Sequence, residues 1–293
     1  MKLLHLSIAL FSLSVVLLYA TERNQSVSTI PNTSNAQDFV QPTIPSHTTT
    51  QPPLVTAQGV YIVDTATQTV LYQKDAEKRL APASTTKMMT ALIASEVYDP
   101  NMIVTVPFFT VDGQKMKVFA GERISVESLL YGTLVDSAND AAEVFSRIYP
   151  GGREAFISYM NTKAKALGMM NTTFQNPTGL DDPLHESTAH DMAILGGEIM
   201  RQPALRQIVG TTSASVTSAN GKFTHYFKAT NMLLTTVPGV EGIKTGWTEA
   251  AHENLVTYVN RDHHPIIIAL LGSDDRFGET KSLIEWIYGS TAW

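Results

Sequence analysis

The chain has 293 residues, of which 43% are hydrophobic, so it can bury one large core or two small ones. Its net charge of -6, with no basic block, argues against nucleic acid as a partner. It contains no cysteine, which excludes disulfides, cysteine–zinc sites and thiol catalysis.

The first twenty residues have the features of a targeting segment. Lys2 supplies a positive charge, an apolar run extends from Ile8 to Leu18, and Leu18-Tyr19-Ala20 offers a cleavage site. Residues 3–20 are also just long enough to span a bilayer and are the segment that would contact a membrane. We therefore expect residues 1–20 to be a signal peptide or a retained N-terminal anchor, and the protein to be exported to the periplasm or the cell-wall space.

Residues 21–53 are rich in Thr, Ser, Asn, Gln and Pro. Such a segment cannot bury enough apolar surface to offset its chain entropy, so we expect a disordered linker. Order is expected to begin near Leu54, and residues 54–293 are expected to form the catalytic domain.

The first half of this domain is expected to be mainly helical after an initial strand pair. Val60–Val63 and Val70–Tyr72 have the composition of strands. Helices are expected over five stretches, each with good helix formers, a cap or a following glycine: Ser84–Val97, a helix capped by Ser125 and ending at Leu134, Asp140–Arg147, Arg153–Leu167 with Gly168 after it, and a helix capped by Ser187 and ending at Met200.

The last third is expected to consist mainly of strands. Asn220-Gly221 is a strong hairpin signal between Ser213–Thr217 and Phe223–Phe227. Further strands are expected over residues 242–245, 254–260 and 265–271, and a closing helix over residues 278–288. Strands at both ends around a helical middle predict an α+β fold, with one sheet and a helical insertion.

Ser84 and Lys87 are the first candidate catalytic pair. Residues three apart on a helix lie on one face, so the amine can reach the hydroxyl. Lysine removes a proton only when it is neutral, and its ordinary pKa is near 10.4. A dry pocket and a second cation, for which Lys244 is the candidate, would lower that pKa. The bare Ser-x-x-Lys pattern also arises by chance.

Two further motifs complete the candidate site. Ser137-x-Asn139 places a hydroxyl and an amide before an expected helix, although either residue alone is an ordinary helix cap. The hydroxyl is suited to proton transfer, and the amide to binding a substrate carbonyl or to orienting Lys87. Lys244-Thr245-Gly246 offers a cation and a hydroxyl for a carboxylate, and a strand edge with no side chain at Gly246. A serine with a lysine one turn later, a second serine with an asparagine, and a lysine beside a glycine form a known catalytic set for acyl transfer.

These motifs and their surroundings resemble the serine-type D-alanyl-D-alanine carboxypeptidases, the low-molecular-mass penicillin-binding proteins. The resemblance covers residues 56–288. The matching stretches are Ala81–Ala91, Leu129–Gly132 with Ser137–Ala142, Asn176–Asp181, His190–Ala193 and Gly239–Thr248. Ala138 stands where many relatives have glycine, a small change that we expect to be tolerated.

The resemblance implies a penicillin-recognising (β-lactamase-like) fold, built on a five-stranded antiparallel sheet flanked by helices. Ser84 would be the nucleophile, Lys87 its base and Ser137 a proton relay. Backbone N–H groups of Ser84 and Trp247 would form the oxyanion hole. The residues that would hold substrate are Asn139, Lys244, Thr245, Gly246, Trp247 and Arg276.

The activity that the resemblance implies is removal of the terminal D-alanine from peptidoglycan stem peptides that end in D-Ala-D-Ala, through a Ser84 ester. β-Lactams would acylate the same serine. Many relatives carry a second, β-rich domain and a C-terminal anchor, for which the chain, ending at Trp293, is expected to have no room. No metal motif is present and no cofactor is expected.

Three alternatives stay open. A class A-like β-lactamase shares the motifs but needs a Glu-x-x-Leu-Asn segment after the second motif, which the sequence lacks. An endopeptidase that cuts wall crosslinks has the same motifs. A non-catalytic wall-binding module is disfavoured because every proposed catalytic side chain is present.

Overall fold

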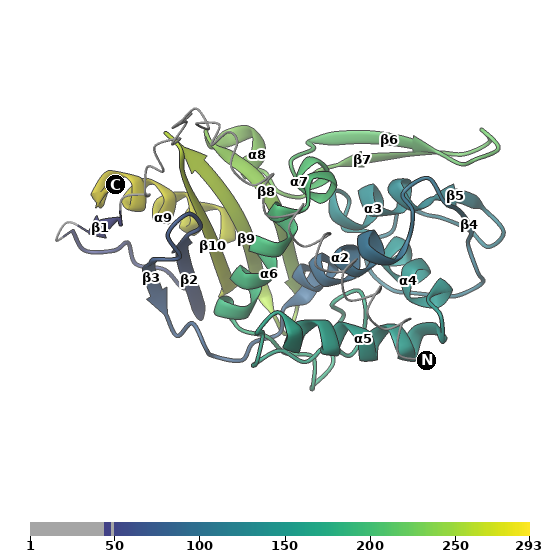
Figure 1. Ribbon diagram of the computed structural model, residues 1–293, viewed down its shortest axis with the longest axis horizontal. Helices are drawn as coiled ribbons and strands as arrows, with labels where there is room; N and C mark the ends of the chain where they lie inside the picture. The colour runs from purple at the N-terminus through teal and green to yellow at the C-terminus, as the bar shows by residue number, and fades with distance from the viewer. Residues whose placement is uncertain (1–43, 48–49) are drawn as a thin grey trace, which may run out of the picture. The chain divides into compact units, whose positions relative to one another are not determined.

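The structure is a computed structural model that describes residues 44–47 and 50–293 (Figure 1). The expected targeting segment and most of the expected linker lie outside the described residues. Among the residues that the structure describes, no helix combines the length and hydrophobicity needed to cross a membrane.

Five antiparallel strands form the main sheet, in the order β3-β2-β10-β9-β8. The N-terminal pair therefore joins the C-terminal strands, as the order of elements along the chain predicts. The strand bounds are β2 Gly59–Asp64, β3 Val70–Lys74, β8 Val240–Thr248, β9 His252–Arg261 and β10 His264–Ser273. All five expected strands of this sheet are confirmed, each with longer limits than expected.

The two faces of the sheet are buried against different helices (Figure 1). In β10, Ile266, Ile268 and Leu270 face α9 (Arg276–Ser290), whereas Ile267 and Ala269 face α6 (Ala189–Arg201) and the helices beyond it. Side chains alternate across a strand, so a continuous apolar run serves both cores. Complete burial of one such aliphatic side chain stabilises the fold by about 1.5–3 kcal/mol.

The helical part surrounds α2, whose residues Met88, Met89, Leu92 and Ile93 are fully buried. A helix that is apolar on every side belongs in the centre of a helical layer. The helix bounds are η1 Ala83–Thr86, α2 Lys87–Val97, α3 Val126–Leu134, α4 Asn139–Ile148, α5 Gly152–Ala166, α7 Pro203–Val209 and α8 Leu233–Thr236.

Two small hairpins extend from this part. Strands β4 (Ile103–Thr105) and β5 (Arg123–Ser125) form one, and β6 (Ser213–Thr217) and β7 (Thr224–Lys228) form the other. The expected Asn-Gly hairpin is confirmed, and Gly221 has the positive φ of 73° that such a turn requires.

Several sequence predictions need correction. The helix expected from Ser84 begins as a 3-10 turn and becomes α-helical at Lys87. Thr188 caps α6 in place of Ser187, because its hydroxyl accepts from Asp191 N at 3.0 Å. Helix α7 was not expected. Its short amphipathic stretch gives a weak periodic signal.

Ordered contacts also begin before Leu54. Residues Ser46–His47 form β1 and pair with β11 (Thr291–Ala292). The indole of Trp286 donates to Thr50 O at 3.4 Å. The segment expected as a linker thus contains residues that pair with the other end of the chain, which local composition does not reveal.

Candidate active site

The nucleophile candidate lies where a short 3-10 turn becomes a helix. Ala83 has a positive φ of 48°, and α2 starts at Lys87. Lys87 Nζ lies 2.8 Å from Ser84 Oγ, as the spacing of three predicts. In its neutral form the amine at that distance can accept the hydroxyl proton. Ser84 is partly exposed, whereas Lys87 is completely buried.

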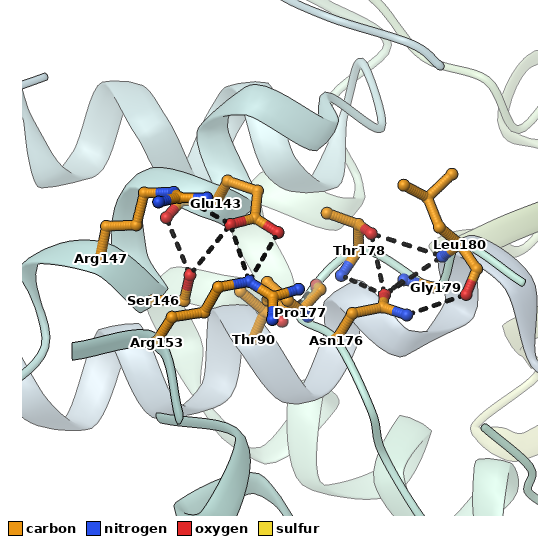
Figure 2. Close-up of polar contacts among 10 residues, drawn as sticks. All are labelled: Thr90, Glu143, Ser146, Arg147, Arg153, Asn176, Pro177, Thr178, Gly179 and Leu180. Carbon is orange, nitrogen blue, oxygen red and sulfur yellow. Dashed lines mark hydrogen bonds and ion pairs between the residues drawn. The ribbon is translucent and has the colours of Figure 1, made fainter. Parts of the chain in front are cut away.

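A loop from another part of the chain holds the same amine. Lys87 Nζ donates to Thr178 O at 2.7 Å. Figure 2 shows how Asn176 builds this loop, since its Oδ1 accepts from the backbone N–H groups of Thr178, Gly179 and Leu180 at 2.7–3.2 Å. Thr90 on α2 donates to Pro177 O at 2.6 Å and fixes the loop to the helix. The amine is thus positioned from two sides.

The electrostatics of Lys87 favour the neutral amine. Burial lowers the pKa of Lys87 well below its ordinary value, and the nearby Lys244 cation lowers it further. Asp140 acts in the opposite direction and does not reverse the shift. Burial and a second cation are the two causes that the sequence predicts. A buried lysine with a lowered pKa, in contact with a serine hydroxyl, is suited to act as a general base.

The second motif lies across from the first. Ser137 has a φ of 60° just before α4, and its Oγ accepts from Lys244 Nζ at 2.8 Å. The Asn139 amide donates to Asp112 O at 2.6 Å and makes no hydrogen bond to Lys87. Asn139 N donates to Gln114 O at 2.7 Å. The motif is therefore held by the segment before α3, and the expected alternative in which Asn139 orients Lys87 is not what the structure has.

The edge strand β8 supplies the third side. A Cβ at Gly246 would lie 3.1 Å from Ser84 N, so this strand passes directly beside the nucleophile. Thr245 Oγ1 and Thr230 Oγ1 share a hydrogen bond of 2.6 Å. Burial, followed by the Arg276 charge, lowers the pKa of Lys244 to about 7. The side chain of Trp247 is 62% exposed and leaves the strand edge open.

Arg276 approaches β8 from the start of α9. Its Nη1 donates to Gly246 O at 2.8 Å, and its backbone N donates to Glu253 at 2.9 Å. Its Nε is buried and has no acceptor among the residues that the structure describes. Burial lowers the pKa of Arg276, which stays a cation at any ordinary pH.

The structure therefore brings together all three motifs, which extend from Ser84 to Gly246 along the sequence. Ser84–Lys87 and Ser137–Lys244 form two serine–lysine contacts of 2.8 Å, beside an open strand edge. This geometry can activate a hydroxyl, shuttle a proton and hold a carboxylate, which are the requirements of acyl transfer.

Sequence reasoning missed several contributing groups. The carbonyl of Thr178 and the hydroxyl of Thr230 contact the site from distant segments. The carboxylate of Asp140 accepts from the backbone of Met116, Lys117 and Val118 and so fixes the segment that holds Asn139. The stretch Asn176-Pro177-Thr178-Gly179 is among those that resemble the family. Its asparagine two residues before a threonine was the available signal for a side-chain-stabilised turn at this position.

Two histidines of the described residues, His185 and His225, are buried. His185 is buried and shares a hydrogen bond of 2.9 Å with Thr86 Oγ1. His225 is buried against Glu122. His190 contacts Glu77 at 3.0 Å, and with Asp191 these residues place possible metal-ligand atoms within 4.8 Å of one another.

The fold and the paired serine–lysine contacts define the class of penicillin-binding DD-peptidases. Within that class, the chain belongs to the D-alanyl-D-alanine carboxypeptidase family, peptidase family S11, whose model matches residues 46–275.

Curated relatives agree with this family. D-alanyl-D-alanine carboxypeptidase DacF of Bacillus subtilis is 33% identical over 242 residues, which cover 79% of this chain and 62% of that protein. A D-alanyl-D-alanine endopeptidase of Escherichia coli is 32% identical and is matched over 82% of this chain and 80% of its own. The chain spans about three fifths of the length of the first curated relatives it matches.

Solved structures share the fold. A D-alanyl-D-alanine carboxypeptidase from Mycobacterium tuberculosis superimposes with a TM-score of 0.77 and 30% identity, over 82% of this chain and 94% of that one. The Streptomyces K15 DD-transpeptidase superimposes with a TM-score of 0.76 and 26% identity, over 82% of this chain and all of the other. The predicted penicillin-recognising fold is confirmed.

Proposed function

We propose that this protein is a serine-type D-alanyl-D-alanine carboxypeptidase that removes the terminal D-alanine from peptidoglycan stem peptides. The observation that carries the proposal is the 2.8 Å contact between Ser84 and the buried amine of Lys87, whose pKa is lowered by burial and by Lys244. A neutral amine beside a hydroxyl supplies the base that a serine nucleophile needs.

The reaction has two steps. Lys87 takes the proton of Ser84, and Oγ attacks the carbonyl between the two D-alanines. The C–N bond breaks, D-alanine leaves with a proton relayed through Ser137, and an ester remains on Ser84. Water then attacks the ester and gives up a proton to the Lys87 amine. The ester C–O bond breaks, Ser84 Oγ regains a proton, and the shortened peptide is released. Backbone N–H groups of Ser84 and Trp247 would hold the oxyanion.

Recognition of a free carboxylate would make this an exopeptidase. Lys244, Thr245 and Arg276 surround one end of the β8 edge, and the buried Nε of Arg276 has no acceptor in the described part of the chain. A terminal carboxylate would be attracted by the cations at this end of the strand, and Gly246 would let the peptide backbone lie against the strand. Asn139 would bind the peptide on the opposite wall. A β-lactam carries a carboxylate beside a strained amide and would acylate Ser84 in the same way.

The site also bears on the β-lactamase alternative. The hydrogen bond that Ser84 Oγ makes within the described residues is with Lys87, and no carboxylate contacts the hydroxyl there. Without a carboxylate to activate water, the penicillin ester should be hydrolysed slowly. We further propose that the protein is exported, with residues 1–20 as the targeting segment.

The test uses intact-mass spectrometry and D-alanine release. Wild-type protein exposed briefly to penicillin should gain the mass of one ring-opened antibiotic on the peptide that contains Ser84, and should release D-alanine from a diacyl tripeptide ending in D-Ala-D-Ala. Ser84→Ala should do neither. Release by Ser84→Ala, or no release by wild type, would favour a binding module. Rapid recovery of free enzyme would favour a β-lactamase.

An endopeptidase is the second candidate, because two relatives named as D-alanyl-D-alanine endopeptidases match with 75% and 80% of their length covered. Both reactions use the same nucleophile and break a bond that follows a D-alanine. They differ in the group that leaves.

A further inference from the structure

Three side chains that can ligate a metal ion lie together at the start of α6, apart from the residues of the candidate active site. They are Glu77, His190 and Asp191, and one ligand atom of each lies within 4.8 Å of the other two. His190 Nδ1 lies 3.0 Å from Glu77 Oε1 and 3.6 Å from Asp191 Oδ1. Glu77 is remote from the other two in the sequence, so no motif spacing indicates this cluster.

Asn171 holds both carboxylates of the cluster, each by one oxygen. Its backbone N–H donates to Asp191 Oδ2 at 2.9 Å, and its side-chain Nδ2 donates to Glu77 Oε2 at 2.9 Å. Arg79 Nη2 donates to Asn171 Oδ1 at 3.2 Å and so fixes the direction of the carboxamide. The Thr172 hydroxyl adds a second donor to Asp191 Oδ2 at 2.7 Å. The remaining oxygens, Oδ1 and Oε1, are those that approach the imidazole.

The second oxygen of Asp191 has no donor of its own. The side chain is 1% exposed, and a carboxylate so deeply buried normally has partners at both oxygens. Oδ1 accepts no hydrogen bond from the residues that the structure describes, and its distance of 3.6 Å from His190 Nδ1 is too long for one. This oxygen is directed at the imidazole and at Glu77, which points to a ligand between the three groups.

The charges of the cluster favour a cation. Among the described residues, neither Glu77 nor Asp191 has a lysine or arginine as an ion-pair partner, and Arg79 forms its ion pair with Glu186. With a neutral imidazole the cluster carries two negative charges, which one divalent ion neutralises. The side chains of Glu77 and His190 are 60% and 33% exposed, so an ion can reach them from solvent.

We propose that Glu77, His190 and Asp191 bind a divalent transition-metal ion, with Zn²⁺ as the species to test. The ligand atoms are Oε1, Nδ1 and Oδ1, and water completes the shell. An imidazole with two carboxylates suits Zn²⁺ better than Mg²⁺ or Ca²⁺, which prefer oxygen ligands alone. Tetrahedral Zn²⁺ holds its ligand atoms about 3.3 Å apart, and the two distances from Nδ1 lie on either side of that value.

The ion would strengthen an existing joint in the fold. Leu80 and Ser187 exchange backbone hydrogen bonds of 2.8 and 2.9 Å, and His190 N donates to Ala76 O at 3.1 Å. The segment between β3 and η1, which leads to the nucleophile, is thereby attached to the start of α6. A metal ion shared by Glu77 and α6 adds a side-chain link to the same joint, and binding to the folded chain alone would stabilise it.

The experiment measures metal binding to the full chain, prepared without a histidine tag and freed of metal with a chelator. Titration calorimetry with Zn²⁺ gives stoichiometry and affinity, and the visible absorption of added Co²⁺ reports the geometry of the shell. The variants are Glu77→Gln, His190→Ala and Asn171→Ala. The matched control is His252→Ala, because His252 Nδ1 also lies 3.6 Å from a carboxylate oxygen, that of Asp274, without a second acid in the contact.

We expect wild type to bind one Zn²⁺ at this cluster and its melting temperature to rise with added Zn²⁺. The affinity should be moderate, because the positive end of the α6 dipole opposes a cation and only three protein groups ligate it. Glu77→Gln and His190→Ala should lose this binding and the tetrahedral Co²⁺ spectrum. Asn171→Ala, which removes a group that orients a ligand, should weaken binding about tenfold. His252→Ala should bind as wild type does, and excess Mg²⁺ should not displace Co²⁺.

Two results would overturn the site. One is the absence of saturable Zn²⁺ binding to wild type. The other is the same Zn²⁺ affinity in wild type and Glu77→Gln, which replaces an exposed side chain with one of equal size and should fold even if His190→Ala does not. Either result would leave the cluster as a protonated imidazole between two carboxylates. The outcome is independent of the proposed function, since penicillin acylation of Ser84 is measured without metal.

Discussion

Gly179 offers a sharp test of how the loop that holds Lys87 also shapes the nucleophile segment. Its φ is +85°, and a Cβ built on it would lie 1.8 Å from Ala83 O and 2.9 Å from Ser84 N. Both neighbours are backbone atoms, so no side-chain rotation can relieve the contact. The substitution Gly179→Ala must therefore displace either the nucleophile segment or the loop by about 1 Å.

The expected magnitude has two parts. An alanine at a left-handed position costs about 1–2 kcal/mol from its own backbone conformation. Gly168, with a φ of +84° and nothing within 4 Å of a built Cβ, isolates this part, so Gly168→Ala is the matched control. The contact with Ala83 should add about 2 kcal/mol or more in the free energy of unfolding, in the range of overpacking. Displacement of Ser84 by about 1 Å should slow acylation on the order of 100-fold.

Urea unfolding and the second-order rate of penicillin acylation measure the two effects separately. Gly168→Ala should lose about 1–2 kcal/mol in stability and keep its acylation rate. Gly179→Ala should lose about twice that or more, and should acylate slowly even where it is fully folded. Equal stability losses for the two variants, with both acylating at the wild-type rate, would refute the reasoning from backbone contact.

Three further predictions follow from the titrating groups. Lys87→Arg should lower the acylation rate by about 10²–10⁴-fold, because arginine stays protonated and cannot act as a base; a near-wild-type rate in stopped-flow acylation would contradict that role. The pKa of Lys244 is lowered from 10.5 to about 7 in the folded protein. Between these two pH values Lys244 is protonated in the unfolded chain and neutral in the folded chain, so the free energy of unfolding should rise with pH over this window. Lys244→Met should flatten that rise in urea titrations, and it should move the acidic limb of the acylation profile to higher pH, because the Lys244 cation lowers the pKa of Lys87; an unmoved limb would count against the coupling. The pKa of His185 is lowered by burial from 6.5 to about 4, so stability should decrease by up to about 3 kcal/mol as pH falls through that interval. His185→Gln should remove most of the decrease, and an equally steep loss in that variant would assign the acid sensitivity to other groups.

Local signals in the sequence predict most of the fold. The Ser125 cap accepts from Ser128 N at 3.1 Å, Gly168 follows α5 with a positive φ, and Asn220-Gly221 turns the hairpin. Each depends on a few adjacent residues. The predictions failed where distant contacts decide. The pairing of Ser46–His47 with the C-terminus depends on a segment remote in sequence.

The same division applies to the site. The Ser84–Lys87 contact follows from helical spacing, and the three motifs lie together as the resemblance to the known catalytic set predicts. The positions of the loops that contact Lys87 and Asn139 could not be predicted from the sequence. Thr178 O reaches Lys87 because residues 176–180 fold around the carboxamide of Asn176. Every residue has a backbone carbonyl, so the sequence does not indicate which one accepts from Lys87. Asn139 instead bonds Asp112 O, because the segment before α3 packs beside it.

The two buried lysines suggest how substrate binding and base activation are linked. Lys87 and Lys244 are 0% and 1% exposed, and two like charges in one dry site disfavour each other. Burial and the Arg276 charge lower the pKa of Lys244 to about 7, so Lys244 titrates in the neutral range of pH. A substrate carboxylate beside Thr245 would favour the charged form of Lys244, and that charge in turn favours the neutral form of Lys87. The ligand that presents the scissile bond would thereby also hold the amine at position 87 ready to take the proton of Ser84.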